Sequence, residues 1–351
     1  MNGAAYHIYS HADADGGIAS AIFGRFLKGL HQGRELQIKI HPVNHGPEQQ
    51  EWTRTELKYP CAILDFSLHP ALLTDKFFLR PEANHSHCEK LSCYWIDHHP
   101  TGSGMPFLTP ENCNQYLSHV VSLWDINAIS TPGLLRSHHK QLGIPAALIE
   151  EYEELIDLAE IIDGALFANA ESAHDFSSDA VKLQTLFSCN HPVVDNGLLY
   201  CKLVEQLMKS PSVDQLMLSD PVFHALIDHE RTQVLRQRRL YERKTIVSQS
   251  VSVSHFFDWP TGEQFPGMGR FIPYLLYPDI HYAVHVQPPK NGIASVSCGI
   301  NPWNKPSSDE KHLGNYFATH FGGGGHAFVA GGRITANEIH KIDELVEFLK
   351  N

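Results

Sequence analysis

The sequence lacks paired cysteines and long apolar runs. Seven cysteines are spread over 351 residues, and no two of them form a Cys-x-x-Cys pair. This odd number disfavours a disulfide framework and indicates reduced thiols, which predicts a cytoplasmic location. No eighteen consecutive apolar residues occur, and the first ten residues lack a basic segment followed by an apolar one. We therefore expect neither a membrane partner nor an export signal.

Positive charge is also scarce, since 27 Lys and Arg face 39 Asp and Glu, a formal net charge of -12. This balance argues against duplex DNA as a partner, because a broad basic surface is needed to hold the phosphate backbone. The charge balance does not exclude phosphate-bearing substrates. Carboxylates that hold cations count as negative in the sequence but present positive charge to a ligand once metal is bound.

One group of His and Cys residues imitates a zinc site without its regular spacing. It stands in a segment rich in Pro, Asn and Ser, and consists of His85, His87, Cys88 and Cys93. Structural zinc sites use short, regular ligand spacings. The sequence favours an exposed loop here.

The first half of the chain alternates short apolar runs with helical patterns. We expect strands at Tyr6–Ser10, Gln37–Val43, Cys61–Phe66 and Ser92–Ile96, and a helix from Ile18 to about Leu30. Such alternation predicts a parallel sheet built from βαβ units. From about Gln115 to Met217 the pattern is mainly helical.

The pattern changes near residue 245. A long helix is expected over Asp220–Ser248, and its basic residues fit a solvated helix better than a nucleic-acid contact, because aromatic residues are scarcely interleaved. Beyond it we expect strands at Val247–Val253, Tyr282–Val286 and Ala294–Ile300, and helices at Leu313–His320 and Asn337–Leu349. The predicted fold is a two-domain α/β protein: an N-terminal parallel-sheet domain (1–219), a helical linker (220–245) and a smaller C-terminal α/β domain (246–351).

The most informative motif follows the first predicted strand, where His11, Asp13 and Asp15 alternate with alanines before a glycine pair. In an extended or turning backbone, side chains two residues apart can converge on one point. Unneutralised, the two carboxylates would repel each other, and a divalent cation would relieve that repulsion. Mixed imidazole and carboxylate ligands suit manganese, iron or zinc better than calcium. The alternative is an Asp that only caps the following helix.

Further acidic and His residues end later strands or helices. Asp65 ends one apolar run, Asp97, His98 and His99 end the next, and Asp163 ends an apolar helical stretch. Ligands of parallel sheets bind at the carboxyl ends of the strands. These groups can therefore assemble with the first motif, which favours a metal site over a helix cap.

Four motifs in order carry a resemblance to a known family. They are His11-x-Asp13-x-Asp15-Gly16, Asp65 in Leu-Asp-Phe-Ser, Asp97-His98-His99, and Gly322 to Gly325 followed by His326. The chain resembles the DHH phosphoesterase superfamily together with its DHH-associated C-terminal domain, a group that includes RecJ-like exonucleases, oligoribonuclease/bisphosphonucleotide phosphatases and exopolyphosphatase-related proteins. The likeness spans nearly the whole chain.

The resemblance implies a centre of two divalent cations, Mn²⁺ first and Mg²⁺ or Co²⁺ as alternatives, in a cleft between the domains. Its implied ligands are His11 and Asp13 for one cation, Asp15, His98 and Asp163 for the other, and Asp65 bridging both. For the last helix-end ligand, Asp157 and Asp125 are alternatives to Asp163. In the same comparison Asp97 orients an imidazole or the attacking water, and His99 contacts the phosphate.

The C-terminal domain is expected to hold the substrate phosphate. Consecutive amides in a glycine run can form an anion-binding concavity, which the resemblance places at Gly323, Gly324, Gly325 and His326. Many family members carry an Arg on a strand where this chain reads Ser295 to Asn304 without one. Substitutes for it are Asn301, Asn304, Arg270 and Arg333. Trp303 either stacks on a base or packs between loops.

These features predict a manganese-dependent phosphodiesterase or exonuclease that hydrolyses short single-stranded oligonucleotides or linear dinucleotides to mononucleotides. Alternatives with the same chemistry are an exopolyphosphatase, a pyrophosphatase or a 3′,5′-bisphosphonucleotide phosphatase. A different class of function is an inactive nucleotide-binding module. A homodimer is compatible with all of them.

Overall fold

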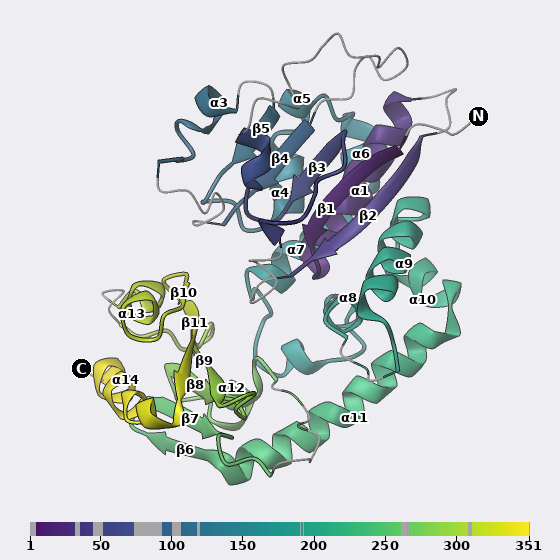
Figure 1. The fold of residues 1–351 in the computed structure, drawn as a ribbon. Helices are drawn as coiled ribbons and strands as arrows, with labels where there is room; N and C mark the ends of the chain where they lie inside the picture. The colour runs from purple at the N-terminus through teal and green to yellow at the C-terminus, as the bar shows by residue number, and fades with distance from the viewer. Residues whose placement is uncertain are drawn as a thin grey trace. The chain divides into compact units, whose positions relative to one another are not determined.

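We analysed a computed structural model of the chain. Contacts within the chain group it into two units, the first formed by residues 1–166 and 176–227 and the second by 167–175 and 228–351 (Figure 1). The structure describes residues 5–31, 36–44, 52–73, 93–99, 107–117, 120–189, 191, 193–260, 265, 267, 269–307 and 311–350. The loop predicted around His85, His87 and Cys88 lies outside these residues.

The first unit is built on a five-stranded, fully parallel sheet. Its strands are β1 (Ala5–His11), β2 (Gln37–Val43), β3 (Cys61–Leu64), β4 (Cys93–Asp97) and β5 (Val120–Trp124), in the order β2-β1-β3-β4-β5. The predicted parallel sheet is confirmed. The prediction that residues 115–217 are mainly helical missed β5, because a short buried apolar strand cannot be told from a helix segment by periodicity.

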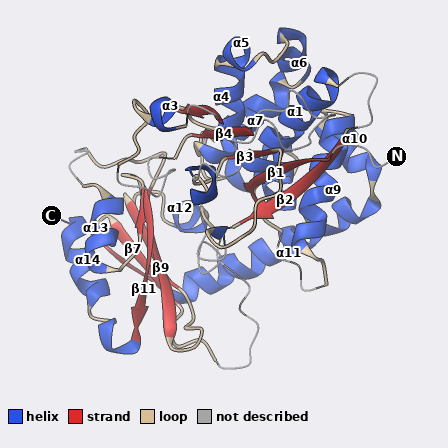
Figure 2. Cartoon of the chain, turned by 45° about the horizontal axis from the view of Figure 1, so that its top comes forward, coloured by secondary structure: helices blue, strands red, loops and turns tan. Residues whose placement is uncertain are grey.

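Helices lie beside this sheet in Figure 2. Those wholly in the first unit are α1 (Ala14–Leu30), α3 (Cys113–Tyr116), α4 (Thr131–Ser137), α5 (His139–Leu142), α6 (Ala146–Glu151), α7 (Glu153–Asp163), α8 (Asp179–Phe187), α9 (Asn196–Lys209) and α10 (Val213–Ser219), with a 3-10 turn at Pro70–Leu73. α1 packs against α4, α7, α8 and α9.

The opposite face of the sheet has its own apolar core. Tyr9, Ile63 and Trp95, from three neighbouring strands, pack there with Trp52 and Phe66 among other buried residues. All five of these side chains are nearly inaccessible to solvent. Burial on both faces explains why the strands read as continuous apolar runs rather than as an alternating pattern.

The second unit contains a six-stranded mixed sheet in the order β10-β11-β9-β8-β7-β6. The strands are β6 (Thr245–Ser248), β7 (Val251–His255), β8 (Tyr282–Val286), β9 (Ile293–Ile300), β10 (Gly324–Gly325) and β11 (Val329–Thr335). Its helices are α12 (Ile272–Leu276), α13 (Leu313–His320) and α14 (Lys341–Lys350), with 3-10 turns at Ser172–His174 and Ala336–Glu338.

The long basic helix is α11 (Pro221–Lys244), and the division between the two units falls inside it. It ends four residues before the predicted Ser248, because Thr245–Ser248 forms an edge strand antiparallel to β7. The single strand expected over Val247–Val253 is therefore two strands. Gln249, with φ of 54°, lies in the turn that joins them. Among the described helices, none has the length and apolar character needed to cross a membrane.

Candidate metal centre

The predicted ligands meet at the carboxyl edge of the parallel sheet. His11 is the last residue of β1, Asp65 follows β3 directly, and Asp97 ends β4. The chain runs from β1 to β2 on one side and then crosses back to β3 on the other side of β1, so the direction of the connections reverses at β1. Such a switch in strand order opens a crevice at the strand ends, and ligands of α/β sheets bind there.

One group of ligands gathers around His11. Its Nδ1 lies 2.6 Å from Asp13 Oδ2 and 3.7 Å from Asp65 Oδ2. The ligand atoms of these three residues all lie within 4.8 Å of one another, close enough for one metal ion. Two carboxylates and an imidazole form a donor set that fits a first-row divalent metal.

A second group gathers around His98. Its Nε2 lies 3.3 Å from Asp15 Oδ2 and 3.7 Å from Asp163 Oδ2, and these three residues meet the same geometric condition. His98 Nδ1 is 3.3 Å from the carbonyl oxygen of Ala128. A histidine that donates one ring N–H to a carbonyl presents its other nitrogen to a metal, which is the usual arrangement in metal sites.

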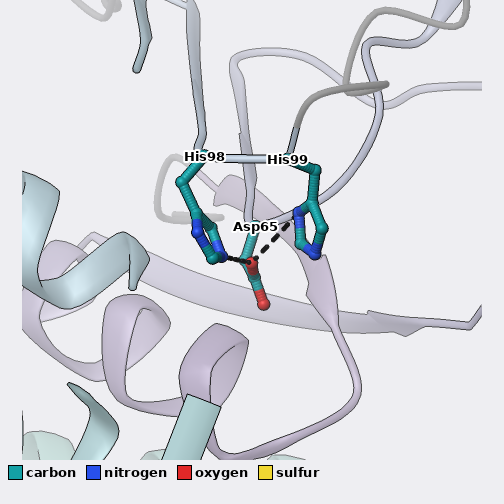
Figure 3. Close-up of side chains that lie close together, drawn as sticks. All are labelled: Asp65, His98 and His99. Atoms are coloured by element: carbon teal, nitrogen blue, oxygen red, sulfur yellow. Dashed lines mark ion pairs between the residues drawn. The ribbon is translucent and has the colours of Figure 1, made fainter. Parts of the chain in front are cut away.

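Asp65 belongs to the group around His11 and also to a third group, formed with His98 and His99, which shares His98 with the second. Its Oδ2 faces His11, and its Oδ1 lies 3.3 Å from His98 Nε2 and 3.7 Å from His99 Nδ1. Figure 3 shows the two imidazoles reaching Asp65 from either side. The side chain is buried, and the backbone φ of 55° is in the left-handed region. Strained backbone of this kind is concentrated at functional sites.

Asp13 satisfies both interpretations of the first motif. Its Oδ1 caps α1 by accepting a hydrogen bond from the N–H of Gly16 at 3.0 Å, while Oδ2 faces His11. Gly16 is needed because a Cβ there would lie 2.2 Å from the His11 carbonyl oxygen. The glycine lets α1 begin directly against the end of β1, which keeps Asp13 and Asp15 beside the sheet edge.

Burial and neighbouring charges shift the pKa values of the acidic and imidazole groups in the centre. Burial raises the pKa of Asp15 well above its usual range, and burial raises the pKa of Asp163 to about 6. Burial alone would lower the pKa of His98, but Asp15 and Asp65 raise it to about 12. The carboxylates around His98 thus favour positive charge at this place. A divalent cation would displace the imidazolium proton and neutralise the carboxylates together.

Two carboxylate oxygens are oriented for such a cation. Among the described residues, neither Asp15 Oδ1 nor Asp65 Oδ2 has a hydrogen-bond partner, although both atoms are buried. Leaving a buried carboxylate oxygen unsatisfied costs free energy, so buried charges pair or bind metal. The residues present therefore fit two divalent cations.

Asp97 acts on the neighbouring histidines. Its buried Oδ1 accepts hydrogen bonds from the N–H groups of His98 at 2.9 Å and His99 at 3.2 Å, and lies 2.8 Å from His99 Nδ1. Burial alone would lower the pKa of His99, but the hydrogen bond to Asp97 and the charge of Asp65 raise it to about 9. Asp97 thus holds the ring of His99 in one orientation.

The alternatives to Asp163 have other contacts. Asp157 pairs with Arg136 at 2.7 Å, and Asp125 accepts the N–H of Asn127. Only Asp163 of these three falls within a described group of potential metal ligands. Asp163 is the last residue of α7, which explains why it follows an apolar helical pattern in the sequence.

Two contacts at the centre escaped the sequence analysis. The buried Thr131 hydrogen-bonds to Asp15 and Asp65. Tyr200, on α9, donates from its hydroxyl to the His11 carbonyl oxygen at 2.9 Å. Neither belongs to an acidic or His motif, and each partner lies far away in sequence.

Tyr200 completes a buried chain of hydroxyl groups beneath the centre. Ser20 donates to Ser10, whose hydroxyl lies 2.7 Å from that of Tyr200. We expect Tyr200→Phe to reduce the free energy of unfolding by about 1–3 kcal/mol, because Ser10 and the His11 carbonyl lose a buried partner. Urea unfolding of the metal-free protein measures this. The matched control is Tyr116→Phe, since Tyr116 is half exposed. Equal midpoints for the two variants would contradict the prediction.

In the second unit, the side-chain amide of Asn301 forms hydrogen bonds with nearby backbone groups. Its amide nitrogen lies 2.8 Å from the Ile280 carbonyl oxygen and 3.2 Å from that of Pro278, while Oδ1 accepts the N–H of Trp303. The side chain is buried. Because both ends of the amide are used, we do not carry Asn301 into the proposed function as a substrate ligand.

Trp303 packs within the second unit. Its indole N–H donates to the Phe167 carbonyl oxygen at 2.7 Å, and its ring lies against Phe271 and Tyr274 with centroid separations of 5.4 and 6.3 Å. These contacts favour the packing interpretation over base stacking. Asn304 likewise donates to the Asp279 carbonyl oxygen.

The glycine run is shaped by close backbone approach. A Cβ at Gly323 would lie 1.9 Å from the Gly331 carbonyl oxygen, and Gly325 has φ of 144°. The amides of Gly323 and His326 donate to the carbonyls of Phe317 and Val329. These two N–H groups are thus engaged within the loop, and an anion site at Gly323, Gly324, Gly325 and His326 stays a prediction.

The two predicted arginines of the second unit are solvent-exposed. Arg333 lies on β11, and the Arg270 guanidinium lies 5.1 Å from the centre of the Phe271 ring. Their exposure leaves both able to meet an anion. Their roles as substrate ligands stay predictions.

Comparisons with known proteins give structural matches only. No family model and no curated protein matches the chain. The pGpG-specific phosphodiesterase PggH from Vibrio cholerae is 16% identical, with 97% of each chain covered and a TM-score of 0.64. RecJ in complex with Mn²⁺ from Thermus thermophilus is 17% identical with a TM-score of 0.52, covering 99% of this chain and 52% of that one. CDC45 from Entamoeba histolytica is 9% identical with a TM-score of 0.55, covering 97% and 94%.

Proposed function

We propose that this chain, which has the α/β fold of the DHH phosphoesterases, is a metal-dependent phosphoesterase. Within that class we propose a manganese-dependent phosphodiesterase that hydrolyses short single-stranded oligonucleotides or linear dinucleotides to mononucleotides. The observation that carries the proposal is the position of Asp65, whose two oxygens face two separate groups of metal ligands.

The proposal assigns a role to each ligand, and the distances within the groups support it. His11 and Asp13 would hold one cation, Asp15, His98 and Asp163 the other, and Asp65 both. Two divalent cations bound there would lower the pKa of a water molecule and stabilise the charge on the phosphoryl oxygens. The imidazole and carboxylate donors are compatible with Mn²⁺, and Mg²⁺ or Co²⁺ are alternatives.

The chain's own residues would orient the substrate. With Nδ1 held by Asp97, His99 keeps Nε2 on the far side of its ring, and its side chain is about one-quarter exposed. These contacts support a role for His99 in hydrogen-bonding to a phosphate oxygen at the centre. A charged donor fixed in this way stabilises charge that develops in a transition state.

One structural neighbour supports a phosphodiester substrate, and another supports Mn²⁺ as the metal. PggH is named as a pGpG-specific phosphodiesterase, and RecJ was solved with Mn²⁺. The net charge of -12 also disfavours long duplexes and fits a small substrate bound at a local site.

A substrate panel tests the proposal. Metal-stripped protein is loaded with Mn²⁺, Mg²⁺ or Co²⁺ and incubated with linear dinucleotides, tri- to pentanucleotides, pyrophosphate, polyphosphate and a 3′,5′-bisphosphonucleotide. We expect mononucleotide release that needs added metal and is fastest with Mn²⁺. Inorganic phosphate release without diester cleavage would select the phosphatase alternatives. Absence of turnover on every compound would leave the inactive nucleotide-binding module.

A further inference from the structure

Thr131 joins two carboxylates that belong to different groups of ligands. Its backbone N–H donates to Asp15 Oδ2 at 2.9 Å, and its hydroxyl donates to Asp65 Oδ1 at 3.2 Å. Thr131 is wholly buried, as are both acids to within 2%. One residue thereby contacts both acids from a third part of the chain.

The two hydrogen bonds of Thr131 engage only one oxygen of each carboxylate. Thr131 binds Asp15 Oδ2 and Asp65 Oδ1, while Asp15 Oδ1 and Asp65 Oδ2 are buried and have no hydrogen-bond partner within the described part of the chain. A carboxylate rotates about its last bond unless one oxygen is held. By holding one oxygen of each acid, Thr131 fixes where the other oxygen points.

Thr131 is itself held firmly. The preceding residue, Ser130, caps α4 by accepting the N–H of Gly133 at 3.0 Å, so the threonine hydroxyl is not required for the cap. A Cβ at Gly133 would lie 2.3 Å from Glu160 Oε1, which shows how closely α4 approaches α7. Glu160 also pairs with Arg136 at 2.8 Å. These contacts fix the start of α4, at Thr131, relative to α7, which ends at Asp163.

We propose that Thr131 is a positioning residue of the metal centre, which sets the orientation of Asp15 and Asp65 for the two cations. The inference rests on the proposed function only in taking this cluster to be a metal centre, and it makes no claim about the substrate. Hydrogen-bond partners of ligating carboxylates typically contribute 10–100-fold to metal affinity or activity.

The test compares four variants in direct binding measurements. Thr131→Val keeps the backbone N–H and the side-chain shape but removes the hydroxyl, and Thr131→Ser restores the hydroxyl. Calorimetric titration of metal-stripped protein with Mn²⁺ gives the number of ions and their affinities. Visible absorption of the Co²⁺-loaded protein reports the ligand geometry. Thr185→Val makes the same change at a buried threonine of α8, and Thr131→Ala pairs with Thr131→Ser as a second comparison that differs only by the hydroxyl.

For Thr131→Val we expect roughly 10-fold or greater weakening of Mn²⁺ binding and a changed Co²⁺ spectrum. Thr131→Ser and Thr185→Val should stay near the wild type. Wild-type affinities and spectrum in Thr131→Val would overturn the inference, as would equal weakening in the serine variant. If the valine variant does not fold, the serine and alanine pair decides by the same criterion.

Failure of this inference differs from failure of the proposed function. Loss of affinity in Thr131→Val, together with no hydrolysis of any compound in the panel, would support the positioning role and reject the activity. Turnover by the wild type together with normal metal binding in Thr131→Val would do the reverse.

Discussion

Asp65→Ala is expected to remove both cations and to lower kcat by on the order of 10³-fold or more, beyond the ~10–100-fold typical of an outer hydrogen-bond partner. Asp65 is the acid that faces His11 with one oxygen and His98 with the other. Burial alone would raise the pKa of Asp65, but the neighbouring imidazoles of His11 and His98 hold it well below its usual range. The carboxylate is therefore ionised and available to both cations.

Asp65→Asn removes the negative charge of Asp65 and keeps a residue that tolerates its backbone conformation. Asparagine tolerates the left-handed backbone that Asp65 adopts, with φ of 55°, and it keeps one oxygen ligand but loses the negative charge. We expect it to retain the fold and to bind at most one cation. Elemental analysis after dialysis counts the ions, and circular dichroism checks the fold. Two tightly bound cations in either variant would show that Asp65 does not bridge.

Asp97→Asn is expected to lower kcat by on the order of 10²–10⁴-fold while leaving metal content close to that of the wild type. Asp97 lies in no described group of potential metal ligands. Its Oδ1 instead holds the ring and backbone of His99. Loss of the charge removes the main interaction that raises the pKa of His99 to about 9, so less of the imidazole is protonated near neutral pH.

A double-mutant cycle makes this assignment specific. If Asp97 acts through His99, then Asp97→Asn combined with His99→Ala should be little slower than His99→Ala alone. Steady-state kinetics at saturating Mn²⁺ gives the three ratios. Fully additive losses, or an unchanged rate in Asp97→Asn, would contradict the role of Asp97.

The sequence could indicate that the candidate metal ligands lie close together, because each stands at a strand end or helix end. Parallel strands share one carboxyl edge, so His11, Asp65 and Asp97 had to approach one another whatever the loops did. Asp163 was harder, because it ends a helix and nothing local distinguished it from Asp157. The ion pair between Asp157 and Arg136 separates them, and it depends on the packing of α4 on α7.

Tertiary contacts explain what the sequence could not show. Thr131 lies 116 residues from Asp15, and Tyr200 lies 189 residues from His11. Neither residue type marks a metal site by itself. β5 was missed for a different reason, because its five residues, four of them apolar, are too few to display a period.

In the second unit, several residues whose type suggests a substrate contact form hydrogen bonds or close contacts within the unit. As a polar residue after a strand, Asn301 suggests a substrate contact, whereas Trp303 suggests either base stacking or packing between loops. Their hydrogen bonds to backbone carbonyls instead hold loops together. Gly323 also has a steric reason, because a Cβ there would meet the Gly331 carbonyl oxygen.

The measurement that tests the two-cation centre most directly is the metal content of the wild-type chain. Metal-stripped protein is dialysed against Mn²⁺, its ions are counted by elemental analysis, and electron paramagnetic resonance reports whether they interact. We predict two Mn²⁺ per chain with the spectrum of a coupled pair. A single isolated Mn²⁺, or none, at concentrations that support full activity would contradict the account.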